Sequence, residues 1–149
     1  MYVGNMLYGA KPWSVDDPSW NLIRDTIVAM EQAGNNQIYL SSRDPEALTF
    51  MMIGGGLDGE TGEHHYVCVV NYVDAVDVSG HASAFRQYFL ENPFMTGYDS
   101  VEIVIDNTSE STESGLAIDQ QMVLAATEYF FENGERSPDL EWCLYCQAP

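Results

Sequence analysis

Two segments with large apolar residues at helical spacing bracket a long stretch of strand-type sequence, and this order limits the folds open to the chain. In the first segment, residues 17–34, these residues fall on one side of a helix: Trp20, Ile23, Ile27 and Met30. Asp17 is expected to cap this helix and Pro18 to take its first position, where a missing N–H costs nothing. Gly34 is expected to end it, because glycine tolerates the left-handed backbone of a helix stop.

The second helical segment, residues 118–134, lies closer to the carboxyl end. Asp119 is its expected cap, and Asn133-Gly134 is its expected end. The buried stripe of this helix is predicted to comprise Val123, Ala126 and Phe130, broadened by Met122 and Tyr129.

Outside these helices the chain has the composition and alternation of β-strands. The predicted strands are residues 37–42, 47–53, 64–73, 84–90, 101–106 and 140–146. Residues 84–90 also fit a short helix, and we favour the strand. A flexible glycine-rich loop is predicted for residues 54–63, and a polar, acidic loop for residues 107–115. The order of elements predicts an α+β domain over residues 1–149, with a mainly antiparallel sheet and two principal helices packed on it.

The charge balance is strongly acidic, since 23 Asp and Glu residues face five Lys and Arg residues, for a formal net charge of −18. Such a surface repels the phosphates of nucleic acids and anionic lipids, so we expect neither as a direct partner. It attracts basic proteins instead, although solubility is an equally simple reason for such a charge.

The remaining composition predicts a globular cytoplasmic protein. Apolar residues make up 46% of the chain, which suits a packed core. The amino end lacks a basic start followed by an apolar stretch, and no apolar run reaches the roughly 20 residues that span a bilayer. The three cysteines cannot all pair within one chain, which fits a reducing compartment.

Two patterns invite a metal or cofactor interpretation, and each lacks a necessary part. The glycine-rich stretch has neither the lysine of a phosphate-binding loop nor the ordered oxygen ligands of a calcium loop. Cys143 and Cys146 form C-x-x-C, yet residues three apart in a strand point to opposite faces, which argues against a shared metal or redox site. We therefore predict no metal and no cofactor.

His64 and His65, beside Glu63, could provide acid–base catalysis, because histidine titrates near neutral pH. Neighbouring strand residues face opposite sides, so only one histidine can line a given surface. The nucleophile-elbow, zinc-protease and deaminase patterns are absent. We predict that the protein is not an enzyme, and a small His-dependent hydrolase remains the least favoured alternative.

In two stretches, residues 58–77 and 99–119, every ionised residue is acidic. We predict that the loops of these stretches form one negative face for a basic partner. The candidate binding residues are Asp58, Glu60, Glu63, Asp106, Glu110 and Glu113. Two unrelated solvated loops are the alternative interpretation.

The segment QMVLAATEYFFENGERSPDLEW, residues 121–142, resembles the carboxyl-terminal hallmark of a family of bacterial immunity proteins. In that family a helix ends in paired aromatic residues, a short polar turn follows, and a strand carrying tryptophan closes the domain. The similar positions here are Phe130, Phe131, Gly134, Pro138, Leu140 and Trp142. The acidic Ser/Thr-rich segment 109–115 and the terminal C-x-x-C depart from the family pattern.

The resemblance implies an α+β fold, no enzymatic activity, and a cytoplasmic protein that binds a cognate toxin of a polymorphic toxin system and blocks its active site. In several such systems the toxin is a nucleic-acid deaminase. The family carries no fixed set of binding residues, because each member matches its own toxin. We expect Phe130 and Trp142 to lie in the core, joining the second helix to the last strand. An acidic interaction adaptor without a toxin partner is the alternative function.

Overall fold

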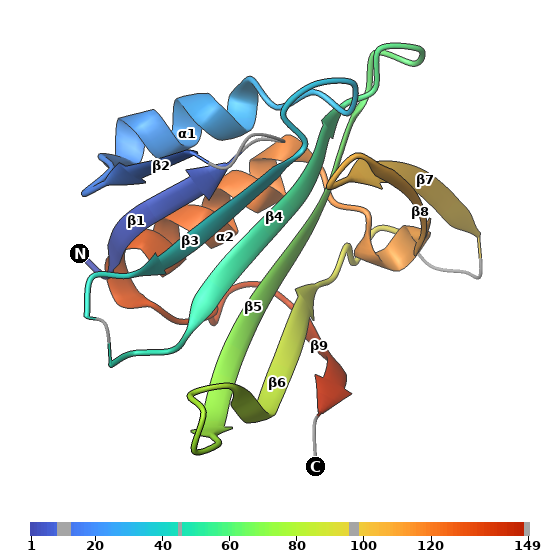
Figure 1. The fold of residues 1–149 in the computed structure, drawn as a ribbon. Coiled ribbons are helices and arrows are strands. Elements are labelled where there is room, and N and C mark those ends of the chain that lie inside the picture. The colour runs from blue at the N-terminus through green and yellow to red at the C-terminus, as the bar shows by residue number, and fades with distance from the viewer. Residues whose placement is uncertain (9–12, 45, 96–98, 148–149) are drawn as a thin grey trace.

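The computed structural model describes residues 1–8, 13–44, 46–95 and 99–147 and shows a seven-stranded, fully antiparallel sheet (Figure 1). The strand order across the sheet is β2-β1-β3-β4-β5-β6-β9. The strand bounds are β1 Val3–Tyr8, β2 Trp13–Asp16, β3 Gln37–Ser42, β4 Phe50–Leu57, β5 His64–Val76, β6 Ala82–Leu90 and β9 Trp142–Gln147.

Two helices, α1 (Trp20–Val28) and α2 (Gln120–Asn133), cover one face of this sheet, and a two-stranded ribbon lies on the other (Figure 1). The ribbon consists of β7 (Ser100–Ile105) and β8 (Thr108–Glu113), and a short 3₁₀ turn, Ser114–Leu116, leads from it toward α2. We call the sheet face opposite the helices the open face. The α+β fold with a mainly antiparallel sheet and two helices packed on it is confirmed.

The main core lies between the helices and the sheet because alternate strand residues point to the helix face. The fully buried strand residues there include Ile38, Leu40, Met51, Ile53, Cys68 and Val70. Helix α1 contributes Ile23 and Ile27, and α2 contributes Val123, Ala126 and Phe130, as their spacing predicted.

The aromatic end of α2 is part of this core. Phe130 is fully buried, and the ring of Tyr2 meets it edge-on with centroids 5.3 Å apart. Phe131 is also buried and lies beside Trp20. Trp142 is half-buried at the margin, where its indole N–H donates to the Ser137 carbonyl over 3.1 Å. These contacts join α2 to α1 and to the residue before β1, and they join β9 to the segment after α2.

The start and end predicted for the first helix are wrong. Ser19 caps α1, with its hydroxyl accepting from the Leu22 amide over 3.1 Å. Asp17 instead contacts the sheet: its amide donates to the Gly4 carbonyl, and its carboxylate pairs with Arg43 at 2.8 Å. Helix α1 ends at Val28, before Gly34, which lies in the following turn. Asp119 and Gly134 were predicted correctly as the cap and the left-handed end of α2.

The assignment of four strands also needs correction. The sequence interpretation missed β1 and β2, in which few apolar residues alternate and a bulge interrupts the register after Val3. The strand predicted at 47–53 runs from Phe50 to Leu57 and includes three glycines. The loop predicted at 107–115 is largely β8, which pairs with β7 through a two-residue turn, Asp106-Asn107, with positive φ at both positions. The strand favoured at 84–90 is confirmed within β6.

Replacing Phe130 with alanine should lower the free energy of unfolding by about 3–5 kcal/mol, because a fully buried ring is lost from a close-packed core. Urea titration measures this change. The control is Phe94→Ala, since Phe94 is 87% exposed and its truncation should stay within about 0.5 kcal/mol. Equal effects of the two changes would contradict the assignment of Phe130 to the core.

Candidate partner-binding face

Three consecutive glycines in β4 let two other segments approach the sheet from opposite sides. A Cβ on Gly56 would lie 2.5 Å from the carbonyl of Met30, just after α1. On the open face, Cβ atoms on Gly54 and Gly55 would lie 2.7 and 2.9 Å from the side chains of Ile105 and Ile103 in β7. The prediction of a flexible loop over 54–63 is therefore wrong for Gly54, Gly55 and Gly56, which form a packed seam in β4.

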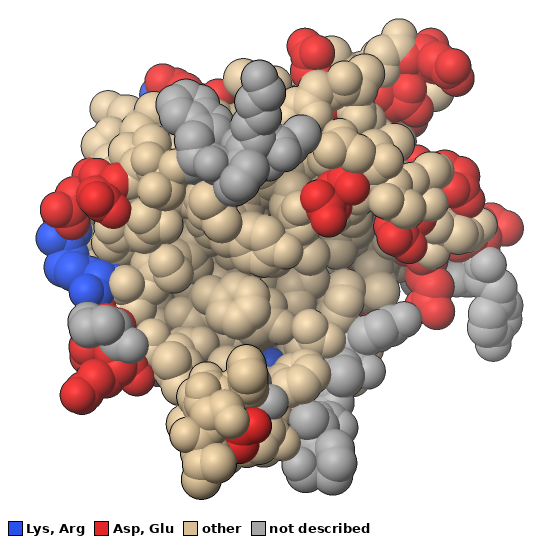
Figure 2. All heavy atoms as spheres, in the orientation of Figure 1, with Lys and Arg blue, Asp and Glu red and all other residues tan. Residues whose placement is uncertain are grey.

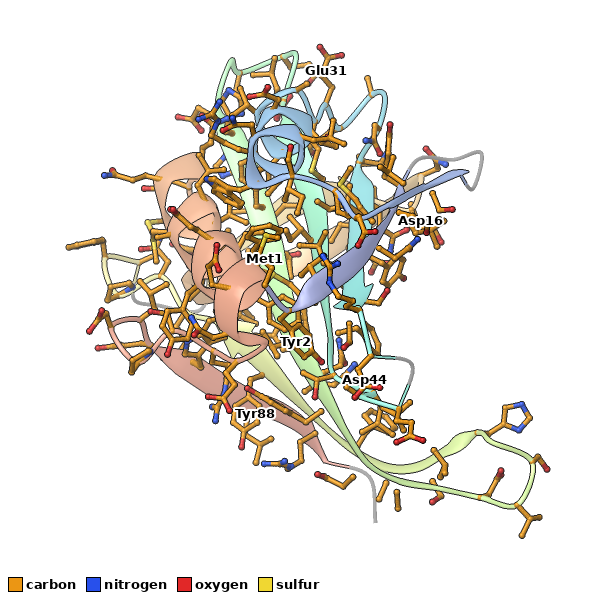
Figure 3. The ribbon with its side chains drawn as sticks, turned by 90° about the vertical axis from the view of Figure 1, so that its left-hand side faces the viewer. Met1, Tyr2, Asp16, Glu31, Asp44 and Tyr88 are labelled. Atoms are coloured by element: carbon orange, nitrogen blue, oxygen red, sulfur yellow. The ribbon has the colours of Figure 1, made fainter. Side chains whose placement is uncertain are left out.

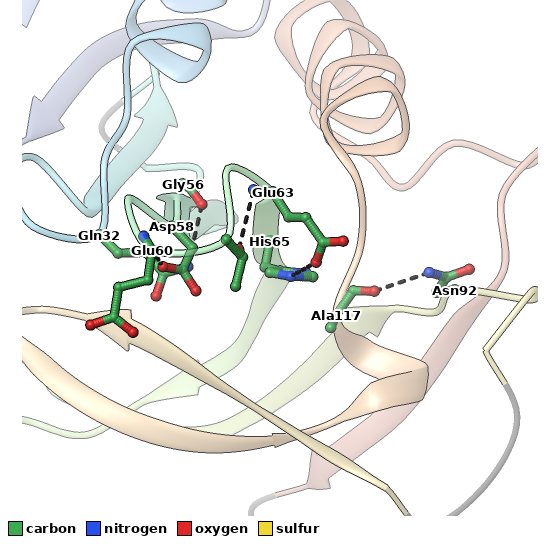
Figure 4. A network of polar contacts seen from close by, with 9 residues as sticks. Gln32, Gly56, Asp58, Glu60, Glu63, His65, Asn92 and Ala117 are labelled. Carbon is green, nitrogen blue, oxygen red and sulfur yellow. Dashed lines mark hydrogen bonds and ion pairs between the residues drawn. The ribbon is translucent and has the colours of Figure 1, made fainter.

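Buried amide side chains of the turn after α1 hold the ribbon at this seam. Gln32 accepts from the Val104 amide over 3.0 Å and donates to the Gly56 carbonyl over 3.4 Å, the latter bond drawn in Figure 4. Asn36 accepts from the Asn107 amide over 3.3 Å and donates to the Asn107 side chain over 3.2 Å. Both side chains are buried, so the ribbon is fixed by satisfied polar contacts as well as by packing.

The underside of the ribbon forms a second, smaller core against the open face. Ile103 is fully buried there with Val67, Val69 and Ala117. Val101 and Ile105, which alternate with polar residues as the sequence predicted, flank it. The opposite strand, β8, is polar and exposed along nearly its whole length. The ribbon thus turns an apolar side to the sheet and an acidic side to solvent.

The structure places all the predicted acidic residues at the end of the sheet where the ribbon lies. We call Asp58, Glu60, Glu63, Asp106, Glu110 and Glu113 the acidic rim. The first three occupy the β4–β5 turn directly after the glycine seam (Figure 4). Asp106 lies in the turn of the ribbon, and Glu110 and Glu113 lie on β8.

Local contacts shape the β4–β5 turn. The carboxylate of Asp58 accepts from the Glu60 amide over 2.9 Å, and the Asp58 amide donates to the Glu63 carbonyl over 2.8 Å. The carboxylate of Glu63 lies 3.1 Å from Nε2 of His65. Five of the six rim side chains are exposed, and Asp58 is half-buried.

The rim is not neutralised by lysine or arginine in the described part of the chain. The arginine ion pairs there join Arg24 to Asp25, Arg43 to Asp17, and Arg86 to Asp74. Figure 2 shows acidic side chains along the side of the ribbon and the β4–β5 turn, with no described basic atoms there in that view. This side can therefore interact with cationic groups without first breaking an internal pair with lysine or arginine.

Away from the ribbon, the open face is largely uncharged in the view of Figure 2, and this face has two hollows. A hollow of about 490 Å³ is lined mainly by Leu7, Tyr39, Leu48 and Phe50. Tyr39 and Leu48 are 36% and 42% exposed. A second hollow, of about 370 Å³, separates β8 from Met52, Val67 and Phe89, and its lining includes Glu110 and Glu113.

The sequence interpretation missed this apolar surface. Tyr39, Phe50 and Met52 occupy the positions of β3 and β4 that alternate with core residues. Apolar residues on both sides of a strand indicate that its second face is covered or binds something. That signal was present in QIYLSS and in ALTFMMI.

The two neighbouring histidines contact different groups. Nδ1 of His64 lies 3.1 Å from the hydroxyl of Tyr66, which donates to the Ile27 carbonyl and lies 3.2 Å from the amide of Gln120. Burial raises the pKa of Tyr66. This chain of contacts connects α1, β5 and α2, and His65 faces Glu63 instead.

The surroundings of both cysteines with a described side chain disfavour the thiolate form. Burial raises the pKa of Cys68, and burial and Glu91 raise that of Cys143. The side chain of Cys146 lies outside the described residues. Among the residues that are described, no His, Cys, Asp and Glu side chains cluster in a way that could hold a metal ion. No described helix has the length and apolarity to cross a bilayer.

No protein-family model and no curated protein sequence matches this chain.

Replacing Gly55 with alanine should destabilise the protein by at least about 1–3 kcal/mol, because its φ of 102° is strained for other residues. The new Cβ would also lie 2.2 Å from the His65 carbonyl oxygen. Urea unfolding measures the loss, and hydrogen exchange at the Val104 amide reports whether the ribbon loosens.

Gly59→Ala provides the matched control, since a Cβ there meets nothing within 4 Å. Its free energy of unfolding should stay within about 0.5 kcal/mol of the wild-type value. A Gly55→Ala variant as stable as this control would contradict the packed seam.

Proposed function

We propose that this chain is an immunity protein that binds a basic antibacterial toxin in the cytoplasm and occludes its active site. The toxin acts on nucleic acid in this proposal, and a nucleic-acid deaminase is one candidate class. The observation that carries the proposal is the acidic rim, unpaired with lysine or arginine among the described residues, together with the two hollows of the open face, one of which is lined by Glu110 and Glu113 of the rim.

This combination matches the anatomy of protein interfaces, in which apolar and aromatic residues at the centre supply most of the binding energy. Tyr39, Phe50 and Leu48 would form that centre. Charged groups at the rim mainly raise the rate at which the two proteins associate. Electrostatically steered association rate constants reach about 10⁸–10⁹ M⁻¹s⁻¹ at low salt.

The chemistry of the partner follows from the charge of the rim. An enzyme that acts on nucleic acid holds phosphates with lysine and arginine side chains. The carboxylates of Asp106, Glu110 and Glu113 would pair with those cations, because they project from a ribbon that is fixed to the sheet. The protein would thus compete with the substrate for the groups that bind it.

An adaptor that binds a basic protein with no toxic activity would use the same surface. The two functions differ only in the partner. A toxin encoded beside the gene for this chain is expected for the immunity protein and not for the adaptor.

Co-expression with the product of the adjacent gene tests the proposal. We expect the neighbour to stop growth when expressed by itself, and this chain to restore growth and co-purify with it. Glu110→Lys/Glu113→Lys should slow association about tenfold at low salt and flatten its salt dependence. Stopped-flow mixing at several salt concentrations measures both effects.

The matched control is Glu128→Lys/Glu132→Lys, an equal charge change on exposed positions of α2, which should alter the rate by less than about twofold. Equal slowing by both variants would show that net charge alone acts and would remove the rim from the interface. A neighbour that is neither toxic nor bound would overturn the immunity proposal, and a bound but harmless neighbour would favour the adaptor.

A further inference from the structure

A further pocket lies on the helix face, where the segment after α2 passes over β5 and β6. It has a volume of about 520 Å³, and its walls include Tyr72, Arg86, Arg136, Pro138, Leu140 and Trp142. Tyr88, labelled below α2 in Figure 3, contacts both arginines from β6. We call this the Arg136 pocket. It is separate from the acidic rim, which belongs to the ribbon and the β4–β5 turn.

Two tyrosines hold the arginines in place. The guanidinium carbon of Arg136 lies 3.5 Å from the centre of the Tyr88 ring, and that of Arg86 lies 5.2 Å from the centre of the Tyr72 ring. The two rings meet edge to face with centroids 5.7 Å apart. Stacking on aromatic rings fixes a guanidinium in orientation while leaving its N–H edges available.

The two arginines differ in what their N–H groups meet. Arg86 donates hydrogen bonds from Nε and Nη2 to the Asp74 carboxylate, at 2.8 and 2.9 Å, and this pairing lowers the pKa of Asp74. Arg136 has no carboxylate within ion-pair distance in the described part of the chain. Its Nε donates to the Tyr72 hydroxyl over 3.3 Å, and the rest of its guanidinium N–H groups meet no described protein acceptor.

We propose that the Arg136 pocket binds a monocarboxylate with an apolar body. A guanidinium edge matches a carboxylate with two parallel hydrogen bonds, as Arg86 and Asp74 already show at this site. Pro138, Leu140 and Trp142 supply the wall against which the apolar body packs. A small organic acid and the free carboxyl terminus of a peptide are the two sources of such a group.

The charges around the pocket favour a ligand with one negative charge over a ligand with two. Arg86 and Arg136 are accompanied by Asp74, bound to Arg86, and by Glu135, which lines the pocket. A phosphate dianion would therefore meet two carboxylates with one uncommitted cation, whereas a carboxylate brings a single charge to Arg136.

Nuclear magnetic resonance titration of the full chain tests this proposal. The probe is 3-phenylpropionate, and its neutral amide is the control with the same apolar body. We expect saturable shifts of the Arg136 Nε–H and Trp142 indole N–H signals with the acid and none with the amide. Inorganic phosphate should bind at least about tenfold more weakly.

Three variants complete the test. Arg136→Gln should weaken binding of the acid at least about tenfold. Arg136→Lys should weaken it as much although the charge is kept, because lysine lacks the planar guanidinium that makes two parallel hydrogen bonds. Arg24→Gln, on the exposed surface of α1, should bind as the wild type does. The spectra of each variant also report whether the fold is retained.

Acetyl-Gly-Phe and its carboxyl-terminal amide distinguish the sources. Tighter binding of the peptide acid than of 3-phenylpropionate assigns the pocket to a chain terminus, and weaker binding assigns it to a small acid. Absent shifts, equal shifts with the amides, or equal binding of phosphate would overturn the proposal. None of these outcomes depends on the toxin partner.

Discussion

The close approach of β7 to the glycines of β4 is the contact on which the acidic face depends. Ile103 and Ile105 occupy space that side chains at Gly54 and Gly55 would fill, while Gly56 leaves room for the turn after α1 on the other side. Gln32 and Asn36 then fasten the ribbon through hydrogen bonds. Without this seam β8 would have no fixed position, and its carboxylates would be mobile charges with no defined relation to the hollow.

The sheet separates stability from recognition by using its two faces differently. Among the described residues, the largest fully buried side chains, including Phe130 and Tyr66, lie in the core of the helix face. The open face keeps Tyr39 and Leu48 partly exposed and carries its acids on an added ribbon. Substitutions at the rim should therefore change charge without weakening the core, which suits a surface that must match one particular partner.

How much the sequence could predict depends on how local the signals are. Helix α2 was predicted with both ends because Asp119 and Gly134 act on their own backbone. Strand β8 was missed because TSESTE has no apolar alternation and owes its form to pairing with β7; the Asp106-Asn107 turn was its one local signal. The glycine seam and the Arg136 pocket join residues far apart in the chain, which no spacing rule connects.

The most direct test of the central claim, that the open face and its rim bind a basic partner, is hydroxyl-radical footprinting of the complex with the purified neighbour-encoded protein. Oxidation of Tyr39, Leu48 and Phe50 should fall on binding, while Val78 and Leu144, which are exposed away from this hollow, should be oxidised as in the isolated protein. Unchanged oxidation at Tyr39, Leu48 and Phe50, with protection of the helix side instead, would contradict the account.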